Sequence, residues 1–282
     1  MTHWSSRRNT SGSVQIGSLF SGIGGFDLAA QWMGWETRWY SEIDPYACRV
    51  MAKHFPRAYN VGDISTWEPM ADARGARQGL LQDEGCVSTS EVGQTSDAES
   101  RSGDSVDLIC GGFPCQPVSV AGKQLAQDDP RWLWPHFARI IRILRPRYIV
   151  VENVPGLLVR GMGDVLGDLS EIGYDAEWET ISAAAVGAPH KRDRIWIVAY
   201  PQRQRRPTGA FHSGIFSETL PETPARKLGG GVRRQSWWDI EPDVGRVAHG
   251  VSARVDRLKC LGNAIVPQVA YWIFQQIEQC ER

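Results

Sequence analysis

The sequence predicts an α/β domain with a mostly parallel sheet, to which a small irregular lobe is attached near the C-terminal end. Three observations support this fold class. Strand-like and helix-like runs alternate along most of the chain, as in parallel sheets covered by helices. Chemically distinctive residues follow the predicted strands, and ligands of such sheets bind at the carboxyl ends of strands. The alternation stops between residues 201 and 258, where Pro, Gly, Arg and Trp are frequent.

The first part of the domain is predicted to contain three strands and two helices. Residues 14–20 form a short apolar run, and the glycine-rich segment after them leads into a helical pattern. Residues 36–44 alternate in polarity and end on acids, which indicates a second strand. Pro45 opens a second helix, and residues 58–65 hold a third short strand with its loop.

The rest of the domain continues this alternation. Gly173 follows a helical pattern directly and is predicted to be the C′ residue of that helix. We expect strands at 106–113, 147–154, 174–187 and 194–200, and helices at 132–146, 164–173 and within 260–279.

The chain divides into segments of different composition. Residues 70–105 are rich in Gly, Ser, Glu and Asp, and their apolar residues show neither helical nor strand periodicity. We therefore predict a mobile insertion there. The predicted organisation is a flexible tail at 1–13, the main domain at 14–200, the lobe at 201–258, and a return to the main domain at 259–282.

Composition excludes several classes of protein. At 282 residues the chain suits one sizeable domain, or one domain with a small lobe. No apolar run approaches the length of a membrane span and the first residues lack a signal peptide, so we expect a cytoplasmic protein. The six cysteines form no CxxC pair and the six histidines no HxxxH spacing. Reduced thiols and no metal site are therefore expected.

Charge is distributed unevenly, although the net charge is only −1. Residues 63–108 hold ten acids against three arginines, whereas residues 200–259 hold eleven Lys and Arg against six acids. A chain with one basic lobe can meet a polyanion on one side. Ordinary solvated loops explain the charge pattern about as well.

Cys115 lies in the unusual segment GGFPCQPVS, residues 111–119. Pro114 and Pro117 restrict the backbone on both sides of the thiol, and the glycines allow another group to approach closely. A rigid thiol at the carboxyl end of a strand is well placed to act as a nucleophile. A structural turn is the alternative that this segment leaves open.

Three further strand ends point to an adenosine-bearing ligand. The segment FSGIGG, from Phe20 to Gly25, resembles a dinucleotide-binding glycine turn, but Asp27 stands where the third glycine would be. Glu42 ends the second strand, where an acid can accept hydrogen bonds from ribose hydroxyls. Asp63 can accept one from an adenine amino group. A tight turn without a ligand is the alternative for the glycine segment.

Glu152 and a basic segment complete the candidate site. Three apolar residues lead into Glu152 at the rim of the sheet, so we expect a partly desolvated carboxyl with a raised pKa, able to donate a proton or a hydrogen bond. Strand alternation places Arg192 and Arg194 on one side of the last strand, where they can bind phosphate or an oxyanion. Solvated strand ends are the structural alternative for all three residues.

These pieces together resemble the DNA (cytosine-5) methyltransferases. The segments FSGIGG, FPCQPVS, ENV, RDR and GNAIVP occur in the family's order, and the resemblance runs from about Val14 to Ala199 and again from about Arg254 onward. It implies a Rossmann-like sheet that binds S-adenosylmethionine, and a small lobe that recognises the target. Ser18 departs from the pattern, because many members carry an acid there.

The resemblance implies roles for individual residues. Cys115 is the nucleophile, Glu152 holds the target cytosine, and Arg192 and Arg194 flank the reacting base. Residues implied to bind the cofactor are Phe20, Gly22, Gly24, Glu42, Ile43, Asp63, Ile64, Leu133 and Asn263. Residues expected to contact DNA are Gln116, Ser119, Arg203, Arg205, Arg206, Arg233, Arg234, Trp237 and Trp238.

The resemblance also implies partners and leaves rival functions open. It implies a monomer that acts on double-stranded DNA in a bacterial or phage-infected cell, without a metal, and it leaves a cognate restriction endonuclease open. Some relatives with a PCQP segment act on transfer RNA, so an RNA methyltransferase is one rival. A catalytically silent DNA-binding regulator is a second. An NAD-dependent oxidoreductase fits less well, because the third glycine is absent.

Overall fold

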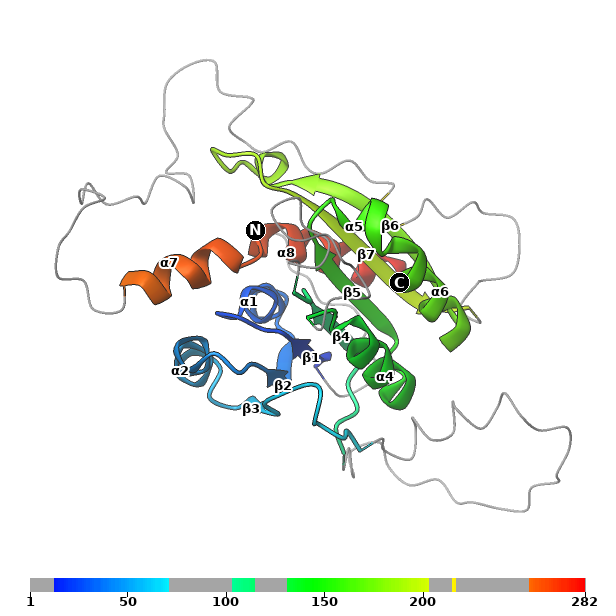
Figure 1. Ribbon diagram of the computed structural model, residues 1–282, viewed down its shortest axis with the longest axis horizontal. Coiled ribbons are helices and arrows are strands. Elements are labelled where there is room, and N and C mark those ends of the chain that lie inside the picture. Colours follow the sequence, from blue (N-terminus) through cyan, green and yellow to red (C-terminus); the bar gives the residue numbers. More distant parts are fainter. Residues whose placement is uncertain (1–12, 71–102, 115–130, 203–214, 217–253, 282) are drawn as a thin grey trace, which may run out of the picture.

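The computed structural model describes residues 13–70, 103–114, 131–202, 215–216 and 254–281. Within them a seven-stranded sheet has the order β3-β2-β1-β4-β5-β7-β6 (Figure 1). The strands are β1 (Gln15–Leu19), β2 (Glu36–Ser41), β3 (Tyr59–Asn60), β4 (Leu108–Gly111), β5 (Tyr148–Asn153), β6 (Tyr174–Ser182) and β7 (Asp193–Pro201).

Most neighbouring strands are parallel, as the sequence predicted. β1 pairs in parallel with β2 and β4, β2 with β3, and β4 with β5. β7 is antiparallel to both β5 and β6. The carboxyl ends of β1 to β5 therefore meet at one edge of the sheet, and β7 begins at that same edge. This reversal brings the first residues of β7 beside the last residues of β5.

Helices cover both faces of the sheet (Figure 1). Alternate residues of β5 show the division: Ile149 and Val151 pack with α4 and α6, whereas Val150 packs with α1 and α8. The described helices are α1 (Gly25–Trp32), α2 (Pro45–His54), α4 (Trp134–Leu144), α5 (Leu157–Arg160), α6 (Met162–Ile172), α7 (Arg254–Asn263) and α8 (Pro267–Cys280), with a 3₁₀ helix at Ala183–Val186.

The ends of several elements follow local chemistry. Asp44 caps α2 by accepting from the backbone amides of Tyr46 and Ala47, next to Pro45 at the first helical position. Gly173 ends α6 with a φ of 93°, which confirms the predicted C′ glycine. None of the described helices is long and apolar enough to cross a bilayer.

Some elements differ from the expected ones. The third strand has only two residues, and the strand expected at 174–187 ends at Ser182, where the hydroxyl caps the 3₁₀ helix. α7 crosses the boundary that the sequence placed after residue 258, and residues 264–266 separate it from α8, of which Pro267 is the first residue. Residues 71–102, within the predicted insertion, lie outside the described residues, as do the tail at 1–12 and most of the lobe.

Met70 and Asp104, which lie just before and just after residues 71–102, are hydrogen-bonded to each other. The amide of Asp104 donates to the carbonyl of Met70 at 2.8 Å, and the amide of Met70 donates to the Asp104 carboxylate at 2.8 Å. Trp39 Nε1 donates to the carbonyl of Asp104 at 2.7 Å. These hydrogen bonds hold Met70 and Asp104 together and attach them to β2.

We therefore expect residues 71–102 to be removable. Replacing them with a short Gly-Ser linker should change the free energy of unfolding by only about 1–2 kcal/mol, because the cost of closing a loop depends weakly on its length. Thermal unfolding of the shortened protein measures this. Asp104→Ala in the shortened chain serves as the control and should destabilise it. A shortened chain that does not fold contradicts the prediction.

Candidate active site

The turn after β1 has an unusual backbone. Phe20 has a φ of 54°, and Gly22 and Gly24 have φ values of 56° and 84°. A left-handed conformation is uncommon for an aromatic residue and is maintained only where the surrounding structure enforces it. The Phe20 ring is anchored against Phe137 of α4, with centroids 6.4 Å apart. The three residues therefore form a fixed turn at the carboxyl edge of the sheet.

Glu42 connects this turn to the end of β2. One carboxylate oxygen accepts from the amide of Gly22 at 2.8 Å, and the other accepts from the amides of Ile43 and Asp44 at 2.9 and 2.7 Å. The carboxylate is fixed by these amides and is only partly buried. It can still accept hydrogen bonds from a ligand over the turn, because a carboxylate has about four acceptor positions.

Ile43 exposes 70% of its surface directly beside this carboxylate. An isolated exposed apolar side chain needs no explanation on its own. Between Glu42 and the glycine turn, however, it provides an apolar surface on which a flat ring can pack.

Asp63 begins the next turn, after β3. Its carboxylate accepts from the backbone amide and the hydroxyl of Ser65, both at 2.8 Å, and these hydrogen bonds lower the pKa of Asp63. The carboxylate is therefore ionised and held in one direction. The neighbouring side chain of Ile64 is buried in the core, so only its main chain is available to a ligand.

The other two residues expected at the cofactor lie on helix ends. Leu133 is partly buried and immediately precedes α4, and Asn263 is exposed at the end of α7. Arg192 holds the turn around Asn263, because one of its terminal nitrogens donates to the carbonyls of Gly262 and Ala264, both at 2.7 Å. The structure thus connects Arg192 to this turn as well as to the Glu152 region.

Glu152 is a buried carboxyl at the end of β5, with 8% of its surface exposed. Burial raises its pKa to about 7, although the nearby charges of Arg194 and Arg192 oppose the shift. Arg194 Nε lies 2.9 Å from one carboxylate oxygen. The raised pKa agrees with the expectation from the sequence, and its cause is burial.

Gly112 leaves room for this carboxyl. A Cβ atom at residue 112 would lie only 2.7 Å from Glu152 Oε2, which is closer than real Cβ atoms approach an oxygen. The segment after β4 therefore needs glycine at this position, because its main chain passes directly beside the carboxyl. The sequence predicted that these glycines let another group come close to the main chain, but it did not identify that group as Glu152.

Asn153 fixes the next part of the same segment. Its side-chain amide donates to the carbonyl of Phe113 at 3.1 Å, and its side-chain oxygen accepts from the amide of Val154 at 2.9 Å. The description of this segment ends at Pro114. Cys115, Gln116 and Ser119 lie outside the described residues, as do Arg203, Arg205, Arg206, Arg233, Arg234, Trp237 and Trp238.

A second buried carboxyl, Asp27, lies next to Ser18. It accepts from the hydroxyls of Ser18 and Thr37, both at 3.0 Å, and burial raises its pKa to about 6. The sequence placed Ser18 where an acid is common, and in the structure the Ser18 hydroxyl donates to the Asp27 carboxylate of α1. The glycine-turn pattern gave no sign of this pairing, because residues 18, 27 and 37 meet only in the folded chain.

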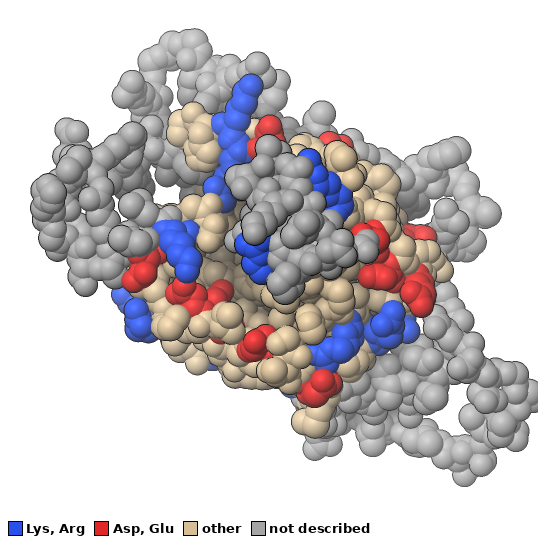
Figure 2. Space-filling model, in the orientation of Figure 1, with Lys and Arg blue, Asp and Glu red and all other residues tan. Residues whose placement is uncertain are grey.

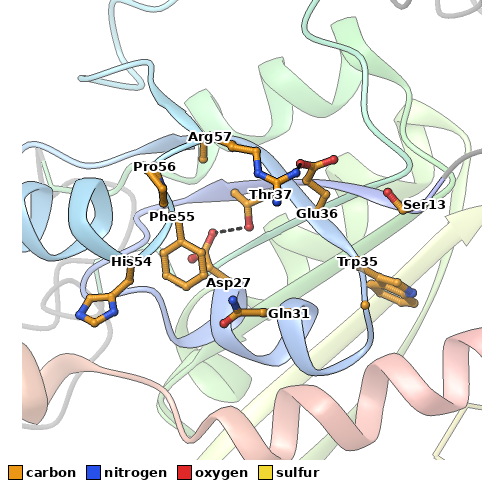
Figure 3. Close-up of a pocket in the computed structure, with 12 residues that line it drawn as sticks. Ser13, Asp27, Gln31, Trp35, Glu36, Thr37, His54, Phe55, Pro56 and Arg57 are labelled. Carbon is orange, nitrogen blue, oxygen red and sulfur yellow. Dashed lines mark hydrogen bonds and ion pairs between the residues drawn. The ribbon is translucent and has the colours of Figure 1, made fainter.

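A cavity of about 390 Å³ lies elsewhere, between α1, the start of β2 and the end of α2 (Figure 3). Gln31, Thr37, His54 and Arg57 are among the residues that line it. It adjoins the amino end of β2, opposite the edge that carries Glu42 and Glu152. Ligands of parallel sheets bind at the carboxyl edge, so we do not assign the site to this cavity.

The described strand ends thus form two adjoining groups. One consists of the glycine turn, Glu42, Ile43 and Asp63, and the other of Gly112, Glu152, Asn153 and Arg194. In the described part of the chain, no three His, Cys, Asp or Glu side chains are arranged to hold a metal ion. The first group has the acceptors and the apolar surface that an adenosine requires, and the second has a proton donor near neutral pH.

Comparisons with known proteins find similar sequences of known description. A family model described as C-5 cytosine-specific DNA methylase matches residues 14–231. The chain is 29% identical over 208 residues to the Type II methyltransferase M.HgiCII of Herpetosiphon aurantiacus, covering 71% of this chain and 40% of that protein. It is 29% identical over 254 residues to the Type II methyltransferase M.NaeI of Lentzea aerocolonigenes, covering 84% and 54%.

A solved structure of a Spodoptera frugiperda DNMT2 mutant aligns with a TM-score of 0.48 and 23% identity, over 70% of this chain and 52% of that chain. The chain spans about half or less of the length of the relatives named here.

Proposed function

Because the chain belongs to the C-5 cytosine-specific DNA methylase family, we propose that it transfers a methyl group from S-adenosylmethionine to C5 of cytosine in double-stranded DNA. The observation that carries the proposal is the carboxyl of Glu152. It is buried beside Arg194, has a pKa of about 7, and faces the main chain that leads to Cys115.

The first group of residues fits the cofactor. Glu42 would accept from the ribose hydroxyls, Ile43 and Phe20 would pack against the adenine, and Asp63 would accept from its amino group. Gly22 and Gly24 shape the turn beside it, Ile64 contributes its main chain, and Leu133 and Asn263 close the sides. When bound, S-adenosylmethionine supplies the methyl group on a positively charged sulfur.

Glu152 would act on the ring of the target cytosine. In its protonated form it donates to N3 and thereby makes the ring a better electron acceptor. Arg194 restricts the carboxyl to one orientation through the ion pair at 2.9 Å. Its charge also keeps the pKa from rising further, so that the proton can be both held and released near neutral pH.

Cys115 would be the nucleophile. Its thiolate would add to C6 and the electron pair would move to C5, which would take up the methyl group as S-adenosylhomocysteine leaves; a base would then remove the C5 proton, and the Cys115 sulfur would leave C6. Asn153 Nδ2 donates to the carbonyl of Phe113, which precedes Cys115 by two positions in the sequence. The last described residues before Cys115 are therefore fixed beside the strand end that carries Glu152.

The substrate must reach this edge of the sheet. A cytosine within a duplex exposes neither C6 nor N3 to a side chain, so the base would have to leave the helix. Lys and Arg side chains border the hollow near the middle of the face in Figure 2, together with acidic ones. The contacts of Arg203, Arg205, Arg206, Arg233 and Arg234 with DNA stay predictions, as do the partnership with a restriction endonuclease and the monomeric state.

The proposal is tested by incubating the protein with mixed-sequence duplex DNA and a tritiated methyl donor. We expect label in the DNA, and bisulfite sequencing should place 5-methylcytosine within one sequence context. Transfer RNA in a parallel reaction tests the RNA alternative. Label in RNA alone would contradict the choice of substrate, and label in neither would favour a silent DNA-binding protein.

A further inference from the structure

The turn that carries Asp63 is held to the domain by contacts of two kinds. Apolar contacts attach it to the core: the side chain of Ile64 is buried there, and the ring of Trp67 packs against Trp39 with centroids 4.7 Å apart. Such contacts bury surface but are non-directional. They do not by themselves determine where the Asp63 carboxylate points.

Arg139 of α4 supplies directional contacts to the same turn. One terminal nitrogen donates to the carbonyls of Ile64 and Trp67, at 3.0 and 2.6 Å, and the other lies 2.9 Å from the Glu68 carboxylate. The Arg139 side chain is 27% exposed, whereas that of Glu68 is 78% exposed. The two carbonyl contacts are therefore better shielded from water than the ion pair.

We infer that Arg139 is a positioning residue, which fixes the Asp63 carboxylate in the direction needed to recognise the amino group of adenine. This inference rests on the proposed function, because it assumes that Asp63 faces the cofactor. Arg139 itself does not touch the ligand. It fixes the carbonyls of Ile64 and Trp67, and the carbonyl of Asp63 accepts from the amides of Thr66 and Trp67 within that turn.

The charge and shape of the guanidinium suit this role. Its planar, rigid array of donors can serve several acceptors in one plane. Leu133 directly precedes α4, so this helix both positions Leu133 at its start and supplies Arg139 to the turn that carries Asp63. Ser65 holds the Asp63 carboxylate within the turn, so loss of Arg139 would leave the turn attached through Ile64 and Trp67 but able to shift as a unit relative to the cofactor.

The experiment compares two ligands. S-adenosylhomocysteine carries the adenine amino group, whereas S-inosylhomocysteine carries an oxygen in its place. Isothermal titration gives the dissociation constants for the unmodified protein and for Arg139→Met, which keeps the aliphatic volume. We expect the unmodified protein to prefer the adenine ligand, and Arg139→Met to lose most of this preference through an adenine affinity weaker by about ten- to a hundredfold.

Two matched variants isolate the carbonyl contacts. Arg142→Ala removes an exposed arginine of the same helix and should leave the preference unchanged. Glu68→Gln removes the exposed ion pair and should also leave it unchanged, because surface pairs contribute little. A preference lost equally in Glu68→Gln would overturn the assignment to the carbonyl contacts.

The outcomes separate this inference from the proposed function. An unmodified protein that binds neither ligand overturns the cofactor proposal and, with it, the role of Arg139. An unmodified protein that prefers adenine, together with a folded Arg139→Met variant that keeps the full preference, overturns the role of Arg139 alone. If Arg139→Met does not fold, Arg139→Lys is measured instead, and a preference equal to that of the unmodified protein overturns the inference.

Discussion

Replacing Cys115 with alanine is expected to abolish methyl transfer while cofactor binding survives. Without the thiolate, nothing adds to C6, and C5 of cytosine is too weak a nucleophile to take up a methyl group. Loss of a covalent nucleophile lowers a rate by about 10⁴-fold or more. Cys115→Ser should behave in the same way, because a serine hydroxyl is far less ionised near neutral pH. Tritiated methyl incorporation into duplex DNA measures the effect.

Cofactor binding is the internal control for this variant. The dissociation constant for S-adenosylhomocysteine should stay within about twofold, because the residues proposed to bind it belong to other strand ends. Cys280→Ala, at an exposed position in the last turn of α8, should leave both activity and binding unchanged. Full methyl transfer by Cys115→Ala contradicts the proposed mechanism.

Replacing Glu152 with glutamine is expected to slow methyl transfer by about a hundredfold or more. Glutamine has nearly the same shape and keeps a hydrogen-bond donor, but it cannot transfer a proton and cannot form the ion pair with Arg194. The single-turnover rate constant with saturating DNA and donor measures the loss. Glu179→Gln, an exposed carboxylate on β6, is the matched control. An unchanged rate constant in Glu152→Gln is evidence against the proposed role.

The pH dependence of the same pair of proteins tests the proton on Glu152. Burial raises the pKa of this carboxyl to about 7, so the protonated form predominates below pH 7 and is lost as pH rises above it. At each pH the rate constant of the unmodified protein is divided by that of Glu152→Gln. Both proteins contain Cys115, so the pH dependence of its thiol cancels in this ratio. We expect this ratio to fall about tenfold per pH unit above 7. A ratio that rises across this range would contradict proton donation by Glu152.

Most of the sheet could be predicted from the sequence, because each strand has a local signal. The run from Tyr148 to Val151 is apolar and mostly β-branched, and Glu152 ends it. The local sequence pattern therefore predicts both the strand and the functional residue at its end. The reversed direction of β7 was not predicted. Strand order and direction depend on which strands pair in the folded chain. The local sequence around Ile195 therefore does not predict that β7 lies between β5 and β6.

The same distinction applies to the site. Glu42, Asp63 and Glu152 were identifiable because each lies at or just beyond the carboxyl end of a strand. Strand alternation grouped Arg192 with Arg194; β7 begins only at Asp193, and the charges of both arginines act on the pKa of Glu152. Arg139 was missed, because its contacts at Ile64 and Trp67 are more than seventy residues away in the sequence. Asp27 was noticed only as a missing glycine, because its partner Thr37 comes from the next strand.

A covalent adduct with DNA tests the central claim most directly. The protein is incubated with S-adenosylmethionine and a duplex in which 5-fluorocytosine replaces the target base, because the fluorine at C5 cannot be removed as a proton is. We predict a complex that survives denaturation, with the modified peptide containing Cys115 and with no complex from Cys115→Ala. A protein that methylates ordinary DNA but forms no such complex, or forms it through another residue, contradicts the account.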